Sequence, residues 1–156
     1  MRLLQEKESR TKYNKIVAWG NSAYKWQQDL ANSTKEHAQI LAMCANQIGK
    51  TTTGAYITAC HLTGKYPNWW KGHKFKKPVK AWACGFIPRL DIVSTTRKPQ
   101  VPNAVQTVLV KHYDLETGRE NGVSRLDFKA YEQGEAKYMG RPMDWVWLDE
   151  QPDSGI

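Results

Sequence analysis

The chain has 156 residues, of which 40% are hydrophobic and seven are tryptophan, so it is long and apolar enough to form one folded domain. No apolar run approaches the ~20 residues that a transmembrane helix needs, and the first residues lack the apolar segment of a secretory signal. We therefore expect a soluble intracellular protein with no membrane partner. The formal net charge of +8 suits a polyanion such as nucleic acid, although a basic surface can also serve solubility alone.

The first third of the chain predicts helix, strand and helix in that order. Residues 1–36 are polar and should be helical in part, with a short helix or turn at Tyr24–Leu30. Ile40–Cys44 is a continuous apolar run of the length expected for a buried parallel strand. Lys50–Leu62 should form a helix that ends at Gly64, because glycine readily adopts the left-handed conformation that closes a helix.

The middle of the chain begins with a loop at Lys65–Lys77, in which aromatic residues and lysines alternate. This pattern is typical of an aromatic cluster that anchors a loop to the core, or of a surface on which single-stranded bases stack. Val79–Gly85 predicts a second strand. Residues 86–106 contain three prolines and should be irregular.

The last third predicts a β-hairpin, a short helix and a final strand. Thr107–Tyr113 and Val123–Ala130 form the hairpin, and the second arm shows the period-2 alternation of a half-buried strand. Tyr131–Tyr138 should form the helix, and Asp144–Leu148 a buried strand. Strands that alternate with helices predict an α/β sheet.

The segment between the first predicted strand and its helix resembles a phosphate-binding loop of the pattern G-x-x-x-x-G-K-[ST], although Cys44 replaces the first glycine. Backbone N–H groups of such a loop cradle phosphate oxygens, its lysine reaches the β- and γ-phosphates, and its threonine hydroxyl binds Mg²⁺. An ordinary strand–turn–helix with a surface lysine would share this pattern. The nucleotide-binding candidates are Asn46, Gln47, Ile48, Gly49, Lys50, Thr51 and Thr52.

Two adjacent acids, Asp149 and Glu150, follow the final predicted strand. The carboxyl end of a buried strand opens at the ligand crevice of an α/β sheet. Asp149 would hold Mg²⁺ there, and Glu150 would polarise the attacking water as the catalytic residue. A solvated turn is the alternative interpretation of this acidic pair.

Gln27 lies beside Trp26 and Tyr24, upstream of the loop. A glutamine side chain can both donate to and accept from an adenine edge, and a neighbouring aromatic ring can stack on the base. A surface helix with buried aromatic residues explains the same pattern equally well.

Four stretches of the chain resemble the ATPase domain of the large terminase subunit of tailed bacteriophages, the motor that packages DNA into procapsids. They are Asn46–Thr51, His61–Trp70, Phe128–Gly134 and Val146–Pro152. The His-Leu-Thr-Gly-Lys-Tyr-Pro and Tyr-Glu-Gln-Gly segments discriminate this family from general helicases, which would also need further motifs downstream. The similarity runs from about residue 24 to the end.

The resemblance implies an α/β fold of the P-loop NTPase type (the ASCE class), with an open, mostly parallel sheet, helices on both faces and a β-hairpin. It implies an N-terminal helical, adenine-contacting segment at residues 1–36 and a partial ATPase domain at residues 37–156. Gln27 would contact adenine, Asn46–Thr52 would hold the phosphates of ATP, Thr51 and Asp149 would bind Mg²⁺, and Glu150 would be catalytic. The arginine finger is open among Arg89, Arg97, Arg141 and a neighbouring subunit.

The resemblance also implies partners: double-stranded DNA, a portal protein, a small terminase subunit and further copies in a ring, all in the host bacterial cytoplasm. Because family members continue into a nuclease domain that has no counterpart here, we expect the chain to be an incomplete, truncated fragment. A DNA- or portal-binding module without ATP turnover is the alternative to an ATPase.

Overall fold

The computed structural model describes residues 15–45, 47–84, 92–97, 105–129 and 142–149. The chain divides into two compact units. One contains residues 1–43 and 66–73, and the other contains residues 44–65 and 74–156.

The first unit contains helices α2 (Lys15–Ser22) and α3 (Lys25–Ser33). The indole of Trp69 donates to the Gly20 carbonyl oxygen at 2.7 Å, and Trp70 is buried, with its ring centroid 5.9 Å from that of Trp69. Trp69 therefore anchors residues 66–73 to α2, as the packing interpretation expects, and base stacking on this loop stays a prediction.

The second unit is built on helix α4 (Lys50–Thr63) and a five-stranded sheet in the order β2-β3-β4-β1-β5. The strands are β1 (Lys80–Cys84), β2 (Ile92–Arg97), β3 (Val105–Tyr113), β4 (Glu120–Phe128) and β5 (Trp145–Leu148). Strand β1 runs parallel to both β4 and β5, whereas the β2–β3 and β3–β4 pairs are antiparallel. The unit is thus an α/β fold with a mixed sheet.

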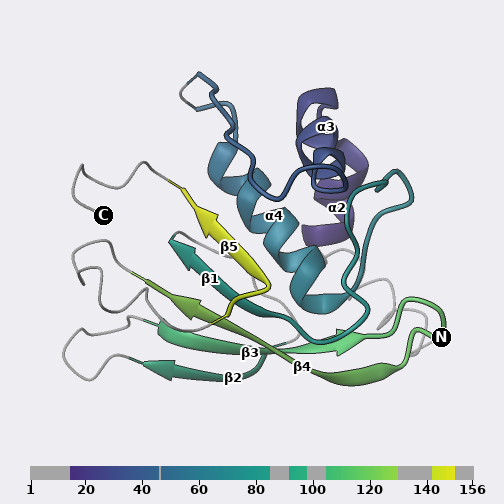
Figure 1. Cartoon of the computed structure of the whole chain (residues 1–156), viewed down its shortest axis with the longest axis vertical. Coiled ribbons are helices and arrows are strands. Elements are labelled where there is room, and N and C mark those ends of the chain that lie inside the picture. The colour runs from purple at the N-terminus through teal and green to yellow at the C-terminus, as the bar shows by residue number, and fades with distance from the viewer. Residues whose placement is uncertain (1–14, 46, 85–91, 98–104, 130–141, 150–156) are drawn as a thin grey trace, which may run out of the picture. The chain divides into compact units, whose positions relative to one another are not determined.

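Helix α4 lies across one face of this sheet (Figure 1). Leu62 packs against alternate residues of β1, β3 and β4, so the period-2 pattern of each strand meets one side of the helix. The sequence of α4 is rich in threonine and contains a glycine, which gives it a low intrinsic helix propensity. Every residue from Thr53 to Thr63 is nevertheless buried, so tertiary packing stabilises this helix.

The strand at 80–84, the hairpin, and the helix closed by Gly64 are confirmed, the last with Gly64 in the left-handed conformation at φ 69°. A strand also forms at 145–148, but it lies at the edge of the sheet and is not buried as expected, because Val146 and Leu148 remain 46% and 50% exposed.

Three further expectations are wrong. Ile40–Cys44 forms no strand, and Leu41 is 83% exposed. An apolar run becomes a strand only where the edge of a neighbouring strand supplies partners for its backbone hydrogen bonds. Residues 86–106 were expected to be irregular, but they contain strand β2. The prolines of this segment lie before and after β2, so they leave its β-branched residues able to pair with β3.

The third error concerns the sheet, which is mixed rather than mostly parallel because β3 pairs in the antiparallel direction with both β2 and β4. Among the described residues of the second unit, α4 alone is a helix, so helices on both faces are not seen there. The helix expected at Tyr131–Tyr138 lies outside the described residues.

Candidate functional site

Helix α4 begins with an uncapped N-terminus. Its N-cap is Gly49, with φ 90° and ψ 27°, and no side chain caps the helix. This left-handed conformation favours glycine, and Gln47 two residues earlier also has a positive φ of 62°. The backbone N–H of Thr53 donates to the Gly49 carbonyl oxygen at 2.9 Å, which starts the helical ladder. The N–H groups of the first turn therefore point outward with the positive end of the helix dipole, an arrangement that suits an anion.

Lys50, the first residue of α4, folds its side chain back over the preceding loop. Its ammonium Nζ donates to the carbonyl oxygens of Ala45 at 2.9 Å and Cys44 at 3.1 Å. These bonds place a half-buried positive charge beside the helix N-terminus, so two positive features converge on one point. A phosphate bound there would compete with the two carbonyl groups for the ammonium.

The first turn of α4 meets the end of β5 through Thr51 and Asp149. The Thr51 hydroxyl donates to the Asp149 carboxylate oxygen Oδ2 at 2.8 Å, across 98 residues of sequence. A hydroxyl and a carboxylate are both oxygen ligands that Mg²⁺ accepts, and adjacent oxygens of an octahedral Mg²⁺ site lie about 2.9 Å apart at metal–oxygen distances of about 2.0–2.1 Å. The separation of these two oxygens therefore fits a magnesium site.

Strand β5 is also attached to α4 by two tryptophans that the sequence analysis did not single out. The Trp145 indole Nε1 donates to the Thr58 hydroxyl at 2.9 Å. The Trp147 indole lies so close to Gly54 that a Cβ at that position would overlap its Cε2 and Nε1 atoms. The available signal was the spacing, because Trp145, Trp147 and Asp149 alternate along one side of a strand.

None of the helices in the described part of the chain is long and apolar enough to cross a membrane.

Residues 41–154 match the family described as "Terminase large subunit, T4likevirus-type, N-terminal". The chain belongs to this terminase family. It is also 31% identical, over 195 aligned residues, to the terminase large subunit of Salmonella phage P22. That match covers the whole chain but 38% of the phage P22 protein, so the chain spans less than half the length of this relative. No solved structure matches the chain.

Only some of the other residues predicted for the terminase site fall within the described part of the chain. Ile48 and Thr52 lie exposed on either side of the start of α4. Asn46 and Glu150 lie outside the described residues, as do Arg89 and Arg141 among the arginine-finger candidates, while Arg97 ends β2. The catalytic role of Glu150 stays a prediction.

Gln27 is buried within α3 of the first unit, with 4% exposure. Its Oε1 accepts a hydrogen bond from the backbone N–H of Tyr24 at 2.8 Å, which satisfies a free donor at the start of that helix. Gln27 thus has a structural role in capping α3, and its contact with adenine stays a prediction.

Proposed function

We propose that this terminase chain binds ATP together with Mg²⁺ at the N-terminus of α4 and hydrolyses the ATP to drive double-stranded DNA into a procapsid. The observation that carries the proposal is the contact of Thr51 with Asp149 at 2.8 Å. It joins the helix that follows the phosphate-loop pattern to the strand that precedes the acidic pair. A P-loop NTPase fold of the ASCE type would place these two segments together for that purpose.

In this proposal each residue of the loop has a separate task. Gly49 allows the backbone to approach the phosphates, the N–H groups from Asn46 to Thr52 cradle them, and the Lys50 ammonium leaves the Ala45 carbonyl to contact them. Magnesium, when bound, would neutralise charge that develops on the phosphate oxygens.

The strand end has a complementary task. Asp149 and the Thr51 hydroxyl would hold the metal, and the neighbouring Glu150 would orient and deprotonate water. The Thr51 hydroxyl donates its hydrogen bond to the Asp149 carboxylate. With Mg²⁺ bound, the hydroxyl proton would turn away from Asp149, and the hydroxyl oxygen would become a metal ligand next to the carboxylate. Gln27 would contact the adenine base in this scheme.

The net charge of +8 supports DNA as the partner, contacted through its phosphates rather than its bases. A portal protein, a small terminase subunit and further copies in a ring complete the proposed assembly. DNA affinity should fall as salt rises, because each neutralised phosphate releases counterions. An affinity that did not change with salt would assign the positive charge another purpose.

The test of the nucleotide site is ATP binding by the Lys50→Ala variant, measured by calorimetry with Mg²⁺ present. Loss of one charge-assisted hydrogen bond should cost about 1.5–3 kcal/mol, which is roughly a 10-fold to 150-fold loss of affinity. The matched control is Lys111→Ala, which removes an exposed lysine of β3 that pairs with Glu120 at the surface. The control should bind ATP as the unaltered chain does. Unchanged affinity in Lys50→Ala would refute the site.

The second candidate function, a binding module without turnover, makes a different prediction for the same chain. It would bind ATP or DNA but release no phosphate. Phosphate release that is lost in Glu150→Gln while ATP affinity is retained would support hydrolysis. Binding with no release under any DNA condition would support the module.

A further inference from the structure

Helix α4 and strand β5 are joined by a row of contacts, which we call the seam. On the helix, Thr51, Gly54 and Thr58 follow the spacing of three and four residues that keeps side chains on one side. On the strand, Trp145 and Trp147 alternate toward that side, and Asp149 continues the same period.

Three positions of the helix each meet a different residue in β5 or directly after it. Thr51 meets Asp149 at 2.8 Å, Gly54 faces the Trp147 indole, and the Thr58 hydroxyl accepts from Trp145 Nε1 at 2.9 Å. His61, one turn further, continues the series, with its ring centroid 4.6 Å from that of Trp145. The helix N-terminus therefore lies at the strand's C-terminal end.

The two elements span comparable distances between the first and the last of these contacts. Seven residues of helix from Thr51 to Thr58 span about 10.5 Å at 1.5 Å per residue. Four residues of strand from Trp145 to Asp149 span about 13 Å at 3.3 Å per residue. A shift of β5 by one residue would move Asp149 by about 3.3 Å and turn it to the other face of the sheet. The contact of Asp149 with Thr51 therefore depends on the register of the whole seam.

The side of β5 that faces away from α4 offers little support. Val146 is 46% exposed and Leu148 is 50% exposed, so both remain largely accessible on that side. Strand β5 is held by its hydrogen bonds to β1 and by the helix-facing tryptophans. Pairing with β1 fixes β5 within the sheet, and the seam determines where the helix lies along it.

Gly54 is the informative residue of the seam. Glycine destabilises a helix interior relative to alanine, so its place as the fifth residue of a 14-residue helix needs a reason. The Trp147 indole supplies that reason, because it occupies the space that any side chain at this position would fill.

We infer that Gly54, Thr58, Trp145 and Trp147 are positioning residues for the metal-binding pair: they set the register of β5 against α4 and so hold Asp149 at Thr51. This inference rests on the proposed magnesium and nucleotide site for its functional consequence. Its structural part, the register, can be measured without any nucleotide.

The first experiment reports the register directly. Thr51→Cys and Asp149→Cys are introduced together, and disulfide formation with oxidised glutathione is followed by peptide mapping, which separates this bond from those of the native cysteines. The pair should cross-link readily, and addition of Gly54→Ala should slow it about tenfold or more, because the Trp147 indole and β5 must move. A further Trp147→Leu change, which makes room for the new methyl group, should restore the rate.

The second experiment reports the consequence for the metal. ATP affinity of the full chain is measured with Mg²⁺ and with EDTA, and the ratio gives the magnesium-dependent part. Gly54→Ala should reduce this ratio by about tenfold or more, because mutation of a residue that orients a metal ligand commonly weakens metal binding by that much. The affinity for ATP in EDTA should be retained, because Lys50 and the loop before it are unchanged. Val146→Ala, on the opposite side of the same strand, is the matched control and should keep the ratio.

The outcomes separate the inference from the proposed function. A cross-linking rate that Gly54→Ala leaves unchanged overturns the inference, and so does an unchanged magnesium ratio. Slowed cross-linking in a chain that binds no ATP overturns the proposed function and the metal role but keeps the register. If Gly54→Ala does not fold, Thr58→Val replaces it, because it removes the acceptor for Trp145 Nε1 at nearly constant volume and should show the same two effects.

Discussion

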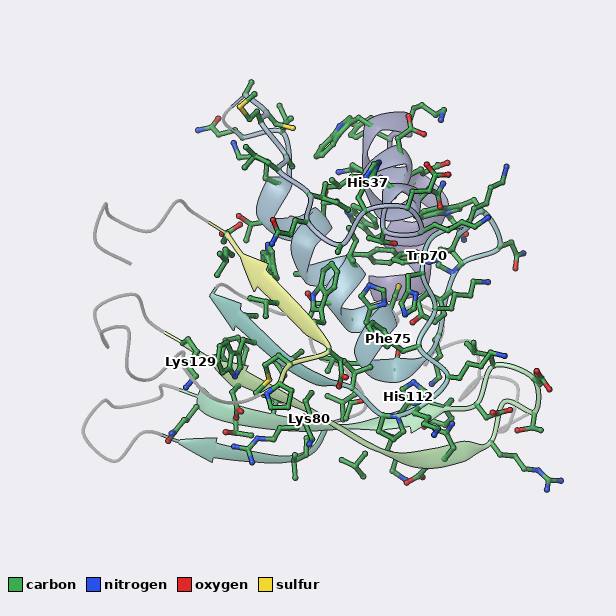
Figure 2. The ribbon with its side chains drawn as sticks, in the orientation of Figure 1. His37, Trp70, Phe75, Lys80, His112 and Lys129 are labelled. Carbon is green, nitrogen blue, oxygen red and sulfur yellow. The ribbon has the colours of Figure 1, made fainter. Side chains whose placement is uncertain are left out.

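The end of α4 offers a sharp test of how closely this helix approaches the sheet. Gly64 closes the helix with φ 69° and ψ 9°, and its N–H donates to the Cys60 carbonyl oxygen at 2.9 Å. A Cβ at this position would overlap the Tyr113 carbonyl oxygen at the end of β3 and lie 3.0 Å from the His112 ring atoms Cε1 and Nε2. Figure 2 shows His112 and Phe75 near this end of the helix. Gly64→Ala therefore combines backbone strain with a collision.

The expected magnitude is the sum of those two effects. Alanine in the left-handed region costs roughly 1–2 kcal/mol, and overpacking of a close contact costs about 1–3 kcal/mol more. The free energy of unfolding should therefore fall by about 2–5 kcal/mol, a large share of the 5–15 kcal/mol typical of a domain. With a urea slope of about 2 kcal/mol per molar, a loss of 3 kcal/mol lowers the midpoint by about 1.5 M.

The chain supplies a matched control in Gly118, which lies in the turn between β3 and β4. Its φ of 64° is close to that of Gly64, but a Cβ added there would meet no heavy atom within 4 Å. Gly118→Ala should lose only the strain, about 1–2 kcal/mol. Urea unfolding followed by tryptophan fluorescence and circular dichroism measures both variants. Equal losses in the two variants would refute the close approach of α4 to β3.

Two titration predictions follow from the same unit. Burial raises the pKa of the Cys60 thiol from 9.0 to about 12, so at pH 8–9 an alkylating reagent should modify the half-buried Cys44 and spare Cys60, as read by peptide mass. Because the folded chain keeps this proton and the unfolded chain releases it above about pH 9, the free energy of unfolding should decline between pH 9 and about 12. Hydrogen bonds from the Thr117 backbone and hydroxyl lower the pKa of Asp114, so its stabilising effect should be present above the ordinary value of 3.8 and lost in stronger acid. NMR titration should show the lowered value, and Asp114→Ala should remove this part of the acid dependence; an ordinary pKa would contradict the turn geometry.

Local features of the sequence determined several elements correctly. The helix that starts at Lys50 and stops at Gly64 follows from its position after a glycine and before another, both in left-handed conformations that other residues rarely adopt. The hairpin follows from alternation along Leu126 and its neighbours, which the sheet places alternately in the core and at the surface. These signals are local because they depend on the conformation of one residue or on the period of one element.

The long-range pairs could not be predicted in the same way. Periodicity does not state which strand edge a segment joins, so Ile40–Cys44 was expected in a sheet that its residues do not enter, and β2 was missed beside β3. The phosphate-loop pattern and the acidic pair were each visible in the sequence, as was their similarity to the terminase family. Only the tertiary structure decided that Thr51 touches Asp149, because a contact across 98 residues depends on how α4 packs on β5. The size of Trp147 and the absence of a side chain at Gly54 determine that packing together, and neither residue reveals it alone.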